Sequence, residues 1–185
     1  HQVSVTHDTR PQGTYSKKGT LVEGAYFLSQ DGVASDSTFH GYNLEFIQLI
    51  PLFKKRTVTA LRFFWQDLYG DTIPFYLQSS LGGDKELRAF IPNRFIDTSK
   101  TIATWEQRIN ILNKKIVGVP VEFYLDPFLE VGRVFHHVNN LSFHDWQSVG
   151  GIGLRAFVPP NVVGRLDIAV GSEGYNVYTM LGYAF

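Results

Sequence analysis

The stretch "GRLDIAVGSEGYNVYTMLGYAF" (residues 164–185) alternates between two kinds of side chain. In its first part, large apolar residues alternate with charged or small ones, namely Leu166, Ile168 and Val170 with Arg165, Asp167, Ala169 and Gly171. A period of two residues is that of a β-strand, because successive side chains point to opposite faces. The stretch therefore predicts two strands, each with one apolar face.

The same alternation continues to Phe185, which ends the sequence. Counting back by twos gives one mostly large and apolar set: Phe185, Tyr183, Leu181, Thr179, Val177 and Tyr175. A water-soluble protein would bury this face in a core, whereas a membrane barrel would turn it to lipid. In a barrel, we expect Phe185 to end the last strand at the membrane interface, where aromatic rings are favoured.

Composition narrows the classes of protein that this chain can represent. The chain has 185 residues, 44% of them hydrophobic, with 15 Phe, 9 Tyr and 3 Trp, so a single domain is expected. The formal net charge is zero, which argues against a nucleic-acid-binding surface. No apolar run reaches the roughly 18 residues that a membrane-spanning helix needs, and no signal-peptide core is present.

Alternation recurs in about eight segments of about ten residues, the length of a tilted membrane-spanning strand. They lie near residues 19–30, 38–50, 55–68, 101–113, 117–136, 146–158, 163–172 and 174–185. The sequence therefore predicts an all-β fold, a transmembrane antiparallel up-and-down β-barrel of about 8 strands. The alternative is a soluble sandwich that places its charges in water.

Charges on the inward face and the lengths of the connections favour the barrel. The inward set is roughly balanced in sign, with seven acids and four arginines: Glu23, Glu45, Arg62, Glu106, Arg108, Glu122, Asp126, Glu130, Arg155, Arg165 and Asp167. Balanced charges can pair in a narrow lumen. The short turns "PLFKKR", "NKKIVG" and "PPNVVG" alternate with longer segments at 31–37, 69–100 and 137–145, as in outer-membrane barrels.

These features divide the chain into two parts. Residues 1–18 are predicted to be a periplasmic lead-in, in which residues 3–10 could form a ninth strand. Residues 19–185 are predicted to be the barrel, with a long extracellular loop at 69–100. We expect the first and last strands of the even set to close on each other, although two chains could instead join into a wider barrel.

Four motifs in order resemble the carboxy-terminal half of the barrel of the BamA/TamA superfamily, the outer-membrane assembly and translocation proteins whose bacterial surface antigen barrel also follows patatin-like domains. They are "HDTRPQGTYSKKG" (7–19), "PFYLQSSLGGDKELRAFIPNRFID" (74–97), "FLEVGRVF" (128–135) and the closing stretch quoted above. The resemblance covers nearly the whole chain. Family barrels have sixteen strands, of which this chain would supply the last eight.

The resemblance implies that the long loop is tied to the barrel wall through Arg88. Its loop-to-lumen motif would be Leu87, Arg88, Ala89 and Phe90, and the lumen partners would be Glu106, Glu122, Phe128, Glu130 and Gly132. A guanidinium binds a carboxylate best in fork geometry, which suits inward-facing acids. The resemblance further implies that Tyr183 and Phe185 form the C-terminal insertion signal read by the barrel assembly machinery.

Ala89 departs from the family pattern, which has Gly at this position. If the family Gly takes a positive φ, an Ala there would be strained. The sequence therefore predicts that the loop conformation differs from that of the family.

The predicted function is a small, non-enzymatic outer-membrane barrel that lacks periplasmic client-binding domains and has a structural or membrane-organising role. The expected location is the bacterial outer membrane. Expected partners are outer-membrane lipids, the barrel assembly machinery during biogenesis, and further copies in a possible homo-oligomer. No nucleic acid, metal or cofactor is expected. A first alternative is a residual role in inserting proteins or translocating protein or lipid through a weak first-to-last strand seam.

A second alternative is an outer-membrane lipid hydrolase. The loop "VFHHVNNLSFHDWQS" contains His136, His137, Ser142, His144 and Asp145, and a Ser–His–acid set there could cleave an acyl chain. No nucleophile elbow or metal-ligand spacing accompanies these residues. A polar loop with a few histidines is the simpler interpretation.

Overall fold

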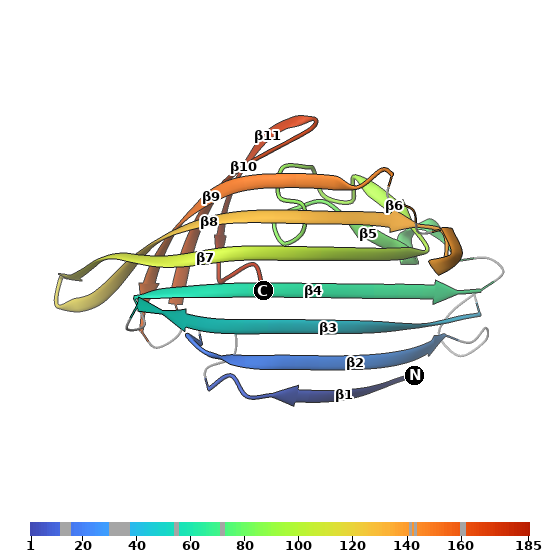
Figure 1. Cartoon of the computed structure of the whole chain (residues 1–185), viewed down its shortest axis with the longest axis horizontal. Coiled ribbons are helices and arrows are strands. Elements are labelled where there is room, and N and C mark those ends of the chain that lie inside the picture. Colours follow the sequence, from blue (N-terminus) through green and yellow to red (C-terminus); the bar gives the residue numbers. More distant parts are fainter. Residues whose placement is uncertain are drawn as a thin grey trace.

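In the part of the chain that the structure describes, eleven strands are formed, nine of them in one antiparallel sheet (Figure 1). The computed structural model describes residues 1–11, 16–29, 38–53, 56–70, 73–140, 142, 144–159 and 162–185. The large sheet contains β1 (Gln2–Asp8), β2 (Gly19–Ser29), β3 (Phe39–Leu52), β4 (Thr57–Tyr69), β7 (Ser99–Ile116), β8 (Val119–Phe135), β9 (Gln147–Val158), β10 (Val162–Gly171) and β11 (Gly174–Leu181). The loop between β4 and β7 carries β5 (Ser79–Leu81) and β6 (Phe95–Asp97), which pair with each other. Two short 3-10 turns lie at Phe75–Leu77 and Val138–Asn140.

All eight predicted segments form strands, so the antiparallel all-β prediction is confirmed. The predicted count of about eight is wrong. Residues 2–8, in the predicted lead-in, form β1 and pair along β2, so the ninth strand left open for residues 3–10 is present, and the hairpin β5–β6 adds two more strands. Each of these two strands has only three residues, which is too short to show a period of two in the sequence.

The predicted closure between first and last strands is not found. Strand order follows the chain from β1 to β11, and among the described residues no backbone pairing joins these two edges. The chain leaves the edge after Leu181, where Gly182 takes a φ of 92° and directs the last residues inward. The sheet therefore curves but remains open.

The two faces of the sheet differ sharply in polarity. Its outward face exposes large apolar side chains on every long strand, including Val22, Leu44, Phe46, Phe63, Leu129, Val131, Ile152, Leu154, Ile168, Val170 and Val177. Its inward face carries buried charged side chains together with four apolar clusters. Figure 1 shows the sheet curving around the loop that holds β5 and β6.

We name the two ends of the sheet by their connections. The short-turn rim holds the β3–β4, β7–β8 and β9–β10 turns, and the long-loop rim holds the β2–β3, β4–β7 and β8–β9 connections. No helix in the described part of the chain is long and apolar enough to cross a membrane.

Candidate functional site

The loop between β5 and β6 folds back onto the inward face of the sheet. Gly82 and Gly83 take φ values of 111° and 119°, a region that favours glycine, and they start the turn. The backbone N–H of Gly83 donates to the Phe90 carbonyl at 3.1 Å, and that of Phe90 donates to the Leu87 carbonyl at 2.9 Å. These bonds close a tight turn that presents Arg88 to the strands.

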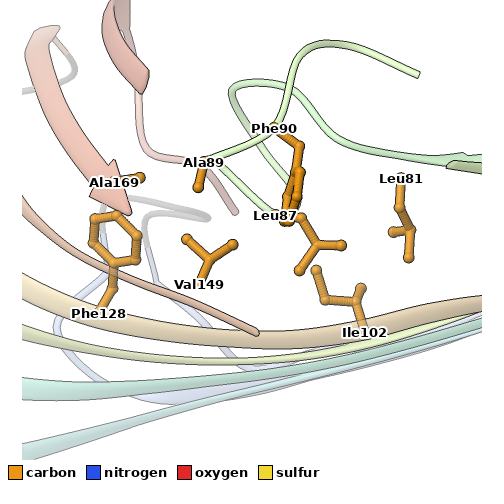
Figure 2. Close-up of a cluster of buried hydrophobic side chains, with 8 residues drawn as sticks. All are labelled: Leu81, Leu87, Ala89, Phe90, Ile102, Phe128, Val149 and Ala169. Carbon is orange, nitrogen blue, oxygen red and sulfur yellow. The ribbon is translucent and has the colours of Figure 1, made fainter. Parts of the chain in front are cut away.

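Apolar side chains on both sides of Arg88 anchor this turn. Figure 2 shows the cluster, in which loop residues meet strand residues: Leu81, Leu87, Ala89 and Phe90 against Ile102, Phe128, Val149 and Ala169. From β11, the Asn176 amide donates to the Ala89 carbonyl at 3.1 Å, and the Tyr178 hydroxyl donates to the Phe90 carbonyl at 3.0 Å. The loop tip is therefore held by four different strands of the wall and by β11.

Arg88 is fully buried and contacts three carboxylates. Its Nε donates to Glu130 Oε1 at 2.9 Å, and its backbone N–H donates to Glu130 Oε2 at 2.7 Å. Its Nη1 donates to Asp167 at 3.0 Å and to Glu106 at 3.3 Å. The guanidinium also lies 3.4 Å from the centre of the Phe128 ring, a cation–π contact.

The ionised form of Arg88 is strongly favoured at this site. Burial by itself lowers the pKa of Arg88, because a charge is poorly solvated away from water. The carboxylates of Glu130, Glu106 and Asp167 outweigh burial and raise the pKa of Arg88 above its ordinary value. Arg88 therefore acts as a permanent cation that joins three strands.

Arg88 belongs to a larger buried network of four arginines and four carboxylates. Its other members are Arg108, Arg155, Arg165, Glu106, Asp126, Glu130 and Asp167. Arg155 contacts Asp167, Asp126 and Glu106, and Arg165 lies 3.5 Å from Asp167. Equal numbers of the two signs offset the cost of burying each charge, provided that the pairs stay intact.

Alternate residues of the loop pair with the wall. Asp84 binds Arg165 at 2.9 Å, and Glu86 binds Lys100 at 2.6 Å and Arg62 at 3.2 Å. Arg88 lies two residues after Glu86 and is positively charged, so it pairs with acids of the wall instead of with bases. Lys85, between the two acids, points to solvent.

Two glycines on β9 make room for this network. A Cβ at Gly151 would collide with the Phe128 ring, and one at Gly153 would collide with the Arg155 guanidinium and the Asp167 carboxylate. Side chains at either position would displace the groups that hold Arg88. These glycines were not among the predicted site residues, because only the tertiary contacts show what they face.

The structure brings most of the predicted lumen residues to Arg88. Glu130, Glu106 and Phe128 contact it directly, and Gly132 lies under Leu81 of the loop base. Glu122 does not contact Arg88, contrary to the prediction. It lies nearer the short-turn rim, where it binds Lys17 at 2.9 Å and accepts a hydrogen bond from Tyr124. Asp167 was expected to face inward but was missed as a partner of Arg88.

The expected strain at Ala89 is not found. Leu87, not Ala89, takes a positive φ of 51° in this turn. Ala89 is buried, and its methyl group packs where Gly171 leaves space. Ala89 therefore fits the anchored loop with an ordinary backbone conformation.

The predicted position of the C-terminal aromatics is also wrong. Strand β11 ends at Leu181, and Tyr183 and Phe185 turn into the interior at the short-turn rim. Phe185 is only 8% exposed and packs on the inward face of β2–β4, against a cluster of Leu21, Ile47, Leu49, Val58 and Ala60. The Arg108 guanidinium lies 3.9 Å from the Tyr183 ring centre, which favours this inward position.

The histidine-containing loop gives little support to a hydrolase. The Ser142 hydroxyl accepts hydrogen bonds from the Arg133 guanidinium at 2.7 Å and from the His144 backbone N–H at 3.3 Å. His137 instead stacks on Tyr69, and His136 lies 3.5 Å from Asp97. Within the described ranges, no group of three or more metal-type side chains is positioned to hold a metal ion.

A scan against protein-family models finds no match, and a search of curated proteins finds no similar sequence. The resemblance to the BamA/TamA superfamily therefore stays a prediction from the motifs. The contacts of Arg88 described above come from the structure and do not depend on this resemblance.

Proposed function

We propose that this chain forms the wall of an outer-membrane β-barrel with a structural or membrane-organising role. The observation that carries the proposal is the polarity of the sheet: charges are buried inside, and large apolar side chains are exposed outside. Soluble proteins seldom expose a contiguous apolar surface of this extent, whereas a lipid-facing wall requires one.

Strand length supports the same proposal. Strand β4 has 13 residues and β9 has 12. At about 3.3 Å per residue and a tilt near 40°, such strands span about 30 Å, the thickness of a bilayer core.

An outward-facing aromatic band at the long-loop rim adds to this support. Tyr26, Tyr42 and Tyr69 lie in neighbouring strands, and the rings of Tyr42 and His40 stack on Tyr69 at 6.4 and 5.5 Å. Aromatic girdles of this kind mark the interfaces of membrane barrels.

In this proposal, the loop that carries Arg88 is a fixed part of the barrel interior. The assembly machinery would read Tyr183 and Phe185 before folding, because Phe185 is buried and Tyr183 is partly buried in the folded chain. The resulting role is that of a rigid, lipid-embedded wall with no enzymatic activity and no cofactor.

One observation favours a second candidate, a residual role in protein or lipid insertion. Both edges of the sheet, β1 and β11, lack a pairing partner among the described residues. In lipid, unpaired backbone groups are too costly to persist, so these edges must pair with other β-structure. A client strand is one such partner.

Depth-dependent fluorescence quenching tests the membrane proposal. The outward faces of β7 and β4 carry Trp105 and Trp65, and the loop before β9 carries Trp146. Variants with one Trp each are folded into vesicles whose lipids are brominated either deep in the acyl chains or near the headgroups. We expect bromines deep in the acyl chains to quench both Trp105 and Trp65, which lie within two residues of the middle of β4 in the sheet register, and to leave Trp146 nearly unaffected.

A gel assay provides a second readout on the same preparations. The folded chain should migrate differently when unboiled and should need detergent or lipid to stay dispersed. A folded, monodisperse chain in plain buffer, with equal quenching of all three tryptophans, would refute the proposal.

A further inference from the structure

The β7–β8 hairpin extends past the rest of the sheet at the short-turn rim (Figure 1). Strand β4 pairs with β7 only as far as Ile109, and β9 pairs with β8 only from Glu122. Residues 111–120 therefore form a two-stranded ribbon whose residues are all exposed. An isolated two-stranded hairpin is marginally stable in water, so this ribbon gains from an additional contact.

The ribbon exposes apolar side chains up to its tip. Ile111, Leu112 and Ile116 are about half exposed, and Val117 is 98% exposed. Val117 and Gly118 form the two-residue turn with φ values of 49° and 82°. Such turns favour Asn-Gly, and a β-branched residue with positive φ is strained. An exposed valine at this position is costly unless the tip contacts an apolar phase.

Basic residues gather at the same rim. Six of the eight lysines occur in three Lys-Lys pairs, at 17–18, 54–55 and 114–115. Lys17 and Lys18 lie in the connection between β1 and β2, at the short-turn rim. Lys54 and Lys55 lie outside the described residues. Lys114 and Lys115 lie on the ribbon itself, and Arg56 precedes β4 beside it.

A cavity of about 310 Å³ lies at the base of the ribbon. Lys17 and Arg56 line it together with Ile111, Leu112 and Glu122. Glu122 neutralises Lys17 at 2.9 Å, which leaves Arg56 as the uncompensated charge among these five. The cavity thus combines a cation with walls that are partly apolar and partly polar, the polar part including Asn110 and Asn113, and its volume fits a group larger than a free phosphate ion.

The opposite rim has a different charge pattern. Its described connections carry the acids Asp84, Glu86, Asp97, Asp145 and Glu173, with Lys85 and Arg94 among them. Arg94 is paired with Glu173 at 2.7 Å. Basic charge is therefore concentrated at the rim that also projects apolar side chains.

We propose that the short-turn rim binds anionic phospholipid. Ile116 and Val117 enter the border between headgroups and acyl chains, Lys114 and Lys115 bind lipid phosphates, and one headgroup occupies the cavity beside Arg56. Basic residues near an anionic membrane surface are attracted to its phosphates, and neighbouring apolar side chains strengthen binding by inserting below the headgroups. This inference rests on the proposed membrane function and specifies which lipid class the barrel selects.

The test measures lipid selectivity in bilayers by electron paramagnetic resonance. The full chain is folded into phosphatidylcholine vesicles that contain a trace of spin-labelled phosphatidylglycerol or spin-labelled phosphatidylcholine. The motionally restricted fraction of each label reports association with the protein. We expect phosphatidylglycerol to be preferred several-fold, with the preference falling as salt is added.

Matched variants locate the preference. Arg56→Gln/Lys114→Gln/Lys115→Gln should abolish it, since each basic residue contributes separately. Lys85→Gln/Arg94→Gln, at the opposite rim, should leave it unchanged. Lys114→Arg/Lys115→Arg should retain it, which separates loss of charge from loss of folding. Ile116→Ser/Val117→Ser should weaken it without any change in charge.

Each contrary result has a distinct meaning. Equal restriction of the two lipids overturns this inference alone, and so does a preference unchanged in the triple variant. Displacement of the labelled lipid by millimolar inorganic phosphate would show a free-anion site and also overturn it. Absence of a restricted fraction for both lipids would show that the chain does not enter bilayers, which refutes the proposed function as well.

Discussion

At the scale of single residues, Arg88 holds the loop to the wall. Replacing it by Ala removes the one ion pair of buried Glu130 among the described residues, while Glu106 and Asp167 keep Arg155 as a partner. Removing one partner of a buried ion pair typically costs about 3–5 kcal/mol. We expect a loss of this size in the free energy of unfolding for Arg88→Ala, measured by urea titration in lipid vesicles.

Related variants show whether the fork geometry matters. Arg88→Lys keeps the charge but cannot donate to three carboxylates in the same way, so an intermediate loss is expected. Glu130→Gln should cost less than Arg88→Ala, and the double variant should be less than additive. Lys85→Ala, in the exposed part of the loop, serves as the control. Equal stability of Arg88→Ala and Lys85→Ala would mean that the loop is not anchored by this residue.

At the scale of strands, the outward face should tolerate a substituted charged residue differently at different depths in the bilayer. Ile152 lies at the centre of β9 and is 53% exposed, whereas Val162 starts β10 at the short-turn rim and is 57% exposed. In a bilayer, Arg costs about 2–4 kcal/mol at mid-depth and about 0–1 kcal/mol near the interface. We therefore expect Ile152→Arg to be strongly destabilising in vesicles and Val162→Arg to be nearly neutral.

The two positions are matched in exposure and chemistry, so depth in lipid is the main difference between them. Exposed substitutions in water usually change stability by less than about 0.5 kcal/mol. Two small and equal effects would therefore support a soluble sheet.

At the scale of the whole molecule, the open edges decide how the wall is completed. The chain has no cysteine, so cysteines introduced as Val5→Cys and Val177→Cys mark the edge strands β1 and β11 cleanly. Because lipid does not tolerate bare edges, we expect a short bis-maleimide to join these cysteines between chains in bilayers. The product should have twice the mass of the monomer on a denaturing gel.

A positive control uses neighbouring strands of one chain. Ile168 and Val177 face each other across β10–β11, so cysteines there should cross-link within the chain. If the Val5→Cys/Val177→Cys chain also cross-links only within itself, β1 and β11 meet and the nine strands close alone. That result would remove the observation that favours an insertion role.

Alternation of side chains determined the strands, their faces and the inward set of charges. This information is local, because the period of two follows from backbone geometry at each residue. The partnership of Arg88 with Glu130 and Glu106 was expected from the loop and strand motifs, and the contacts agree.

Tertiary structure alone decided three features: the open edges, the inward turn of Tyr183 and Phe185, and the sharing of Arg88 with Asp167. Asp167 lies 79 residues from Arg88 in sequence, and the two meet only because the sheet curves around the loop. Likewise, Phe185 fits an apolar surface built by β2–β4. Side-chain alternation specifies which face a residue occupies, but the curvature of the assembled sheet determines which residues meet across its interior.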